Sequence, residues 1–301
     1  MMDNTIHILG MGAIGSLISS QLKRQPVKAI NIVRREISAK LEFTPYQQTK
    51  PTHIKLNTCL TQQLELNSVQ TLLVPLKAFQ VKTAIETMLP YLTPEAVIVL
   101  MHNGLGCREQ IKDILLDTHT IVSATTTHGA FKPSDNELIH TGLGETRLGL
   151  LVNNQEQENL AKLYLNPFLS GFSPCHWDPE IERKLWLKLA INACINPITA
   201  YFQIKNGLVC ETQHQKLIDA ICQEVVHVAN CKGVQFDKQE LIKTVIKVAQ
   251  ATAENFSSMN RDVFYKRQTE INYINGYIVA LANQYQIDVP ANQMMLEWIK
   301  N

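Results

Sequence analysis

The sequence predicts an α/β fold, in which a Rossmann-type doubly wound parallel sheet is followed by an all-helical C-terminal domain. Strand and helix patterns alternate through the first half of the chain, they stop at the segment SGFSPCHWDPEIE, and helical periodicity covers most of the second half. A chain of 301 residues is long enough for two domains with separate cores. We therefore expect a Rossmann-type domain over residues 1–176 and a helical domain over residues 177–301.

The first half contains short apolar runs that are typical of buried parallel strands. The predicted strands cover residues 5–9, 29–33, 70–76 and 96–101, and helical patterns cover residues 13–25 and 79–90. Such β-α-β alternation favours a parallel sheet with helices on both faces. Short strand candidates between residues 121 and 149 are expected to extend one side of this sheet.

The second half begins with a helix-start signal, Asp178-Pro179-Glu180, which combines an N-cap residue, a first-turn proline and a first-turn acid. The helices predicted from this point cover residues 180–201, 212–231, 238–254 and 270–284.

Composition excludes several classes of protein. The formal net charge is +1 and there is no basic block, which argues against a nucleic-acid partner. No run approaches the roughly eighteen apolar residues of a membrane span, and the N-terminus lacks the pattern of a secretory signal, so we expect a cytoplasmic protein without a membrane partner. The 7 cysteines form no CxxC pair, and we expect no metal site.

A GxGxxG motif lies between the first predicted strand and the first predicted helix. In this context the first glycine permits a tight turn, the second lets a pyrophosphate approach the backbone, and the third lets the helix pack on the strand. Backbone N–H groups at the helix start face the anion. The motif predicts a dinucleotide site formed by Gly10, Met11, Gly12, Ala13, Ile14 and Gly15.

The end of the second predicted strand indicates which dinucleotide is bound. NAD-binding proteins usually place an acid there, whereas this chain has Arg34, followed by Arg35. A guanidinium suits the 2′-phosphate of NADP, so we expect NADPH/NADP as cofactor. The alternative is a solvated pair of surface arginines.

Lys77 and Asn103 come after two later predicted strands. Ligands of open α/β sheets lie at such strand ends, although Asn103 could simply form an Asn-Gly turn.

Lys188, Asn192 and Asn196 recur every four residues in an otherwise apolar helical segment, KLWLKLAINACINPITA. This spacing places them on one face of a helix, where a buried ammonium group is costly unless it is paired. The column is either a surface that binds a polar ligand or a solvated stripe followed by a kink at Pro197.

Five segments in this order, LVPLKAFQV, HNGLG, KLAINACINPITA, ENFSSM and RQTEINYINGYIV, resemble the ketopantoate reductases (2-dehydropantoate 2-reductases). The resemblance covers nearly the whole chain and implies a Rossmann domain and a helical domain with the site between them. It implies Lys188 as general acid and Glu270 as the carboxylate that supports it. It also implies substrate contacts from Asn103, Asn192, Asn196 and Ser258, and cofactor contacts from Arg34, Lys77, Gln80 and Asn103.

The chemistry of carbonyl reduction needs the same residue types, because a proton donor must reach the oxygen on which negative charge develops. Glu270 would favour the charged form of Lys188. The structural alternatives are a salt bridge on a helix for Glu270 and a helix cap for Ser258.

We therefore expect NADPH-dependent reduction of ketopantoate to (R)-pantoate, in pantothenate and coenzyme A biosynthesis. The rival functions are reduction of another small 2-oxo acid and a non-catalytic NADP-sensing module, which would need Arg34 but not Lys188 or Glu270. The oligomeric state cannot be read from the sequence.

Overall fold

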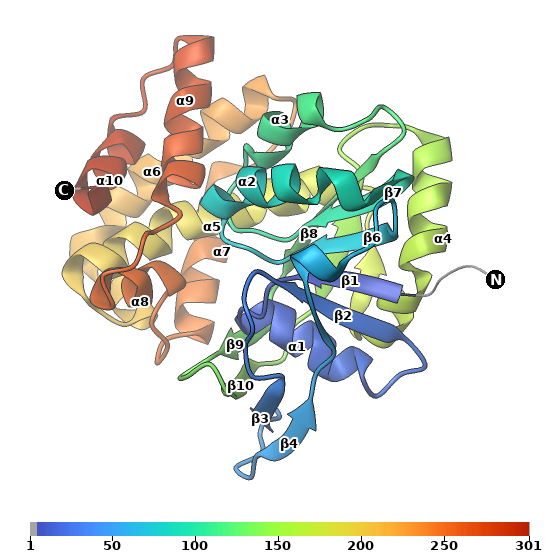
Figure 1. Cartoon of the computed structure of the whole chain (residues 1–301). Coiled ribbons are helices and arrows are strands. Elements are labelled where there is room, and N and C mark those ends of the chain that lie inside the picture. The colour runs from blue at the N-terminus through green and yellow to red at the C-terminus, as the bar shows by residue number, and fades with distance from the viewer. Residues whose placement is uncertain (1–4, 301) are drawn as a thin grey trace. The chain divides into compact units, whose positions relative to one another are not determined.

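The computed structural model describes residues 5–300, and the chain folds into two compact units. The N-terminal unit comprises the residues up to 102 and residues 107–181, and the helical unit comprises residues 103–106 and the residues from 182 on. Figure 1 shows the strands of the N-terminal unit and the helices of the second unit. Each unit has its own cluster of buried apolar side chains.

The main sheet of the N-terminal unit has eight strands in the order β12-β11-β8-β7-β6-β1-β2-β5. Its pairs are parallel except β8 with β11, which confirms the predicted doubly wound sheet. The strands are β1 (Thr5–Leu9), β2 (Lys28–Val33), β5 (Thr58–Leu60), β6 (Val69–Val74), β7 (Leu92–Leu100), β8 (Thr120–Thr126), β11 (Thr146–Gly149) and β12 (Cys175–Trp177).

Helices of this unit pack on the apolar strands. Val97 and Val99 on β7 belong to the same buried apolar cluster as residues of α1 and α4. The alternate residues Ile98 and Leu100 are also buried but lie outside that cluster, because successive side chains of a strand point to opposite faces of the sheet. The helices are α1 (Ala13–Leu22), α2 (Ala78–Met88), α3 (Cys107–Ile111) and α4 (Gln155–Gly171), with short 3-10 turns η1 (Thr61–Gln63), η2 (Leu89–Tyr91) and η3 (Lys112–Ile114).

The prediction that strands between residues 121 and 149 extend one side of the main sheet is confirmed for β8 and β11 and is wrong for the two strands between them. Two of these strands join a second sheet of four strands, ordered β4-β3-β10-β9. It consists of β3 (Lys40–Thr44), β4 (Thr52–Lys55), β9 (Gly129–Phe131) and β10 (Glu137–Gly142). The parallel pairing of β10 with β3 joins segments far apart in the chain, which local sequence patterns do not encode.

The helical unit contains α5 (Ile181–Phe202, of which Ile181 belongs to the N-terminal unit), α6 (Thr212–Cys231), α7 (Lys238–Ala251), α8 (Ser258–Phe264), α9 (Asn275–Tyr285) and α10 (Pro290–Lys300), with η4 (Asn206–Cys210) and η5 (Ile271–Tyr273). The predicted helix over 270–284 is therefore divided, because Ile274 adopts φ −104° and ψ −93° and separates η5 from α9. Within residues 5–300, no helix is both long and apolar enough to cross a membrane.

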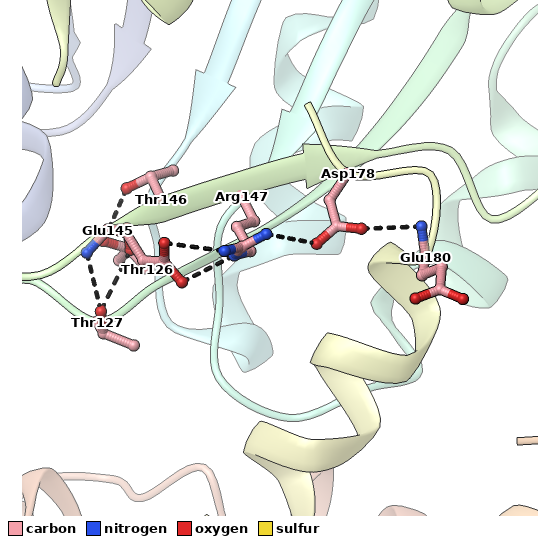
Figure 2. A network of polar contacts seen from close by, with 7 residues as sticks. All are labelled: Thr126, Thr127, Glu145, Thr146, Arg147, Asp178 and Glu180. Carbon is pink, nitrogen blue, oxygen red and sulfur yellow. Dashed lines mark hydrogen bonds and ion pairs between the residues drawn. The ribbon is translucent and has the colours of Figure 1, made fainter. Parts of the chain in front are cut away.

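A polar network at the start of α5 explains where this helix begins (Figure 2). The side chain of Asp178 accepts a hydrogen bond from the Glu180 backbone N–H at 2.9 Å, as expected of the predicted start signal. Its other oxygen pairs with the Arg147 guanidinium at 3.0 Å, and Arg147 also binds both oxygens of Glu145. These bonds raise the pKa of Arg147 and tie the helix start to β11.

Replacement of Asp178 by alanine is expected to lower the free energy of unfolding by about 2–3 kcal/mol, because it removes a helix cap and a partly buried ion pair together. Asp178→Asn keeps the capping oxygen and is expected to cost about 1 kcal/mol. Asp219→Ala, which removes an exposed partner of Lys238, is the matched control and should change stability by less than about 0.5 kcal/mol. Urea unfolding measures all three. Equal losses for alanine and asparagine at position 178 would contradict the contribution of the cap, and an unchanged stability with asparagine would contradict that of the ion pair.

Candidate active site

The polar column on α5 is held on a continuous helix in spite of Pro197. A proline lacks the N–H that would bond to the carbonyl four residues earlier, here that of Ala193. The buried side chain of Asn275 on α9 supplies the missing donor, since its Nδ2 lies 3.1 Å from the Ala193 oxygen. The alternative in which Lys188, Asn192 and Asn196 form a solvated stripe is wrong, because Lys188 and Asn192 are half-buried and Asn196 is only 6% exposed.

Glu270 lies at the start of η5 and is 3% exposed. Its Oε2 accepts a hydrogen bond of 3.0 Å from Nδ2 of Asn103, which is 167 residues earlier in the chain. Lys188 also interacts electrostatically with Glu270. Thus the structure brings together Asn103, Lys188 and Glu270, and the Glu270 carboxylate is buried at the start of a 3-10 turn.

The electrostatic environment of Lys188 suits a proton donor. Burial lowers the pKa of Lys188 to about 8, although the Glu270 carboxylate acts in the opposite direction and favours the ammonium. The group is therefore mostly protonated at neutral pH, and its pKa lies close to the pH at which it would work. Such a match between pKa and operating pH is typical of general acids.

The loop that carries Asn103 is fixed against η5 by two glycines. Gly104 and Gly106 have φ values of +82° and +101°, and the Leu105 N–H donates to the Tyr273 oxygen at 2.9 Å. A side chain at Gly104 would place its Cβ 2.1 Å from that same oxygen. Residues 103–105 form a bend that belongs to the helical unit, in which Asn103 is hydrogen-bonded to Glu270.

The far end of the column is linked to α8. The Thr199 hydroxyl donates to the Asn196 carbonyl at 3.0 Å, and also lies 2.7 Å from the Ser257 hydroxyl. Ser257 is the N-cap of α8, since its side chain accepts from the Asn260 N–H. The alternative that Ser258 caps this helix is therefore wrong. Ser258 is the exposed first residue of α8, next to a side chain that is bonded to the end of the column.

In the N-terminal unit, the glycine motif has the geometry expected for a dinucleotide turn. Gly10 comes after β1 with φ +81°, and a Cβ at Gly15 would lie 3.3 Å from the Gly10 oxygen and from Pro75, which explains the close approach of α1 to the sheet. A Cβ at Gly12 would meet no atom within 4 Å, so the middle of the turn is open where a pyrophosphate would approach. Met11, Ala13 and Ile14 complete the turn into α1.

Two further cofactor candidates lie at strands that flank β1. Arg34 is exposed and comes directly after β2, and Lys77 lies after β6; both strands pair in parallel with β1. Their carboxyl ends therefore lie at the same edge as the glycine turn. Gln80 accepts a hydrogen bond from the Lys77 N–H at 3.3 Å, and so it also shapes the start of α2.

Sequence reasoning missed residues that support these groups. Asn31 on β2 is fully buried and donates to the Gly10 oxygen at 2.9 Å, while the Ser19 hydroxyl donates to its Oδ1 at 2.6 Å. A polar residue in an apolar strand, KAINIV, is the signal that could have indicated it. Asn275, whose side chain donates to the Ala193 oxygen of α5, has no neighbouring sequence pattern that would have indicated this role.

Two family models match the chain. The ketopantoate reductase PanE/ApbA model matches residues 6–153, and the model of the ketopantoate reductase C-terminal part matches residues 180–301. The chain belongs to the ketopantoate reductase family. It is accordingly an NADP-dependent oxidoreductase of the Rossmann type.

Relatives of the family agree along nearly the full length. The chain is 35% identical over 297 residues to a 2-dehydropantoate 2-reductase of Vibrio cholerae serotype O1, covering 98% of this chain and 96% of the relative. A 2-dehydropantoate 2-reductase of Pyrobaculum aerophilum is 31% identical, with coverage of 98% and 96%.

Two solved structures share the fold of this chain. The 2-dehydropantoate 2-reductase of Geobacter metallireducens GS-15 superposes with a TM-score of 0.86 at 21% identity, covering 98% of this chain and 99% of that one. D-mandelate dehydrogenase in a ternary structure with NADH and anilino(oxo)acetate has a TM-score of 0.89 at 21% identity, with coverage of 98% and 97%.

Proposed function

We propose that the protein reduces 2-dehydropantoate (ketopantoate) to (R)-pantoate with NADPH, as a cytoplasmic enzyme of pantothenate and coenzyme A biosynthesis. The observation that carries this proposal is the cluster of Lys188, Asn103 and the buried carboxylate of Glu270, which a protein that only senses NADP would not need. The relatives named 2-dehydropantoate 2-reductase support the choice of substrate.

Lys188 is proposed as the general acid. When bound at the glycine turn, the reduced dinucleotide would supply a hydride for the C2 carbonyl carbon of the substrate. As negative charge develops on the carbonyl oxygen, the Lys188 ammonium transfers a proton to it, so that one C–H and one O–H bond replace the carbonyl π bond. Lys188 is left as a neutral amine and regains a proton from water. Glu270 keeps the resting amine protonated, and Asn103 orients this carboxylate through a 3.0 Å hydrogen bond.

The remaining polar side chains of the helical unit are proposed to hold the substrate. Asn192 and Asn196 lie one and two turns beyond Lys188 on α5, and Ser258 begins α8 beside the end of that column. Amide and hydroxyl groups can bond both the hydroxyl and the carboxylate oxygens of a small hydroxylated 2-oxo acid. We propose Asn103 as a further contact to both substrate and cofactor.

We propose that residues 1–176 bind the cofactor and that residues 177–301 supply most of the substrate and catalytic groups. Gly10 to Gly15 would hold the pyrophosphate through backbone N–H groups at the start of α1. Arg34 would bind the 2′-phosphate and so select NADPH, with Lys77 and Gln80 as further cofactor contacts.

Steady-state assays test this function. NADPH absorbance is followed with ketopantoate and, separately, with pyruvate, 2-oxoisovalerate and phenylglyoxylate, and each reaction is repeated with NADH. We expect the highest kcat/KM with ketopantoate and a preference for NADPH. A higher kcat/KM with another acid would replace the substrate, oxidation with none of them would favour a sensing module, and a preference for NADH would refute the role of Arg34.

The pH profile tests the coupling of Lys188 to Glu270. Since the ammonium is the active form, kcat/KM for reduction should fall above about pH 8 in the parent enzyme. Glu270→Gln keeps an oxygen for Asn103 but removes the anion that favours the ammonium, so the pKa of Lys188 should decrease further and the fall should begin roughly one pH unit lower.

The matched control is Glu254→Gln, which removes an exposed carboxylate paired with Lys205 in the same unit. Its profile should coincide with that of the parent. A Glu270→Gln profile that keeps the parent midpoint, or that moves to higher pH, would show that Glu270 does not support the charged form of Lys188.

A further inference from the structure

Lys132 lies at the glycine turn although it comes from a distant part of the chain. It is the residue directly after β9, and its Nζ donates to the Met11 backbone oxygen at 3.0 Å, 121 residues away in the sequence. Met11 is the residue between the first two glycines of the motif and precedes the N-cap of α1. An ammonium group therefore lies against the turn that would hold the cofactor's pyrophosphate.

The second sheet positions this lysine. β9 pairs with β10 at the edge of that sheet, and both strands pack on α1, alongside which they are drawn in Figure 1. Gly129, the first residue of β9, has no space for a side chain because a Cβ would lie 2.7 Å from the Thr141 hydroxyl. The close β9–β10 pairing at this glycine and the packing of both strands on α1 place the end of β9, which Lys132 follows, beside this helix.

The Met11 carbonyl alone does not explain a lysine at this place. That oxygen also accepts a hydrogen bond from the Ser16 hydroxyl at 3.1 Å, so it has a partner without Lys132. An ammonium group has three donors, of which the Met11 contact uses one. Lys132 is half-buried, and this burial lowers its pKa, with Asp135 acting in the opposite direction. A nearby dianion would offset the desolvation of this charge far better than a carbonyl does.

We propose that Lys132 is a cofactor-binding residue that neutralises the pyrophosphate of the nicotinamide dinucleotide, and that the Met11 carbonyl holds it in place. Arg34 and Lys132 then have different tasks. Arg34 lies at the end of β2 and distinguishes the 2′-phosphate, whereas Lys132 acts on the group that NADPH and NADH share. The proposal rests on the NADP dependence of the proposed function, but it concerns binding and not the reduction step.

Equilibrium binding to the full-length protein separates these tasks. Dissociation constants for NADPH and for NADH are measured by calorimetry for the parent, Lys132→Met, Lys132→Arg and Arg34→Ala. Lys132→Met should weaken both dinucleotides about tenfold and reduce the dependence of binding on salt. Lys132→Arg should retain most of the affinity, and Arg34→Ala should weaken NADPH while leaving NADH nearly unchanged.

The matched control is Lys40→Met, which removes an exposed lysine from β3 of the same sheet and should leave both dissociation constants unchanged. A Lys132→Met protein that melts at a lower temperature but binds both dinucleotides like the parent would show that Lys132 only fastens β9 to the turn, and would overturn the proposal. Loss of affinity for NADPH alone would overturn it as well. Tight NADPH binding by a parent protein that reduces no 2-oxo acid would refute the proposed function and leave the role of Lys132 intact.

Discussion

Lys188→Ala is expected to lower kcat for ketopantoate reduction by about 10²–10⁴-fold, which is the usual contribution of a positioned general acid. Without the ammonium, negative charge on the carbonyl oxygen would have to be met by water or by neutral amides. The dissociation constant of NADPH should change little, since the glycine turn and Arg34 belong to the other unit of the chain. Rapid-quench or steady-state kinetics at pH 7, together with calorimetric NADPH binding, measure both quantities.

Lys184→Ala is the matched control for this variant. Lys184 is also half-buried and lies one turn earlier on α5. The Lys184→Ala variant should retain kcat within about threefold, because Lys184 lies before the three polar residues of α5 that are proposed to contact the substrate and is not itself proposed to do so. Near-parental turnover by a folded Lys188→Ala protein would exclude Lys188 as the proton donor, and an equal loss in both variants would point to damage to α5 rather than to lost chemistry.

Gly104→Ala is expected to have the largest effect among changes that remove no functional side chain. The new Cβ would lie 2.1 Å from the Tyr273 oxygen, and the φ of +82° is unfavourable for alanine. The HNGLG loop must then move away from η5, which breaks the contact of Asn103 with Glu270. We expect a loss of about 3 kcal/mol or more in the free energy of unfolding and at least a tenfold loss in kcat/KM.

Gly233→Ala separates the two causes of this loss. Gly233 has nearly the same φ, +81°, but a Cβ there would meet no atom within 4 Å. It should therefore show only the backbone cost of about 1 kcal/mol, with unchanged kcat/KM. Thermal and urea unfolding compare the two variants. Equal destabilisation by both would mean that the contact between Gly104 and Tyr273 does not hold the loop.

The local features of this protein were predictable from the chain because they depend on short sequence intervals. The strands 5–9 and 29–33 were predicted to within a residue of β1 and β2, and the helix 212–231 matches α6. Short apolar runs suffice to predict such strands, and helical periodicity suffices to predict such a helix. The same holds for the column of Lys188, Asn192 and Asn196, since a spacing of four residues places side chains on one helix face wherever the helix lies.

Other features were decided only when distant segments packed together. The glycines of HNGLG indicated a turn, but only Tyr273 explains why that turn must lack a side chain. The bond of Asn103 to Glu270 spans 167 residues, and the donor that replaces the missing N–H of Pro197 comes from Asn275 on another helix. Lys132 contacts Met11 because β9 and β10 belong to the second sheet and pack on α1.

The physical reason for this division is the range of the interactions involved. Backbone hydrogen bonding and side-chain periodicity act between neighbours in the chain, so they leave a readable pattern in a window of a dozen residues. Burial, cross-chain hydrogen bonds and the resulting pKa of Lys188 depend on which segments meet in space, and no such window contains both partners. The chain therefore specified which side chains were available for chemistry, and the packed fold specified which of them meet and with what charge.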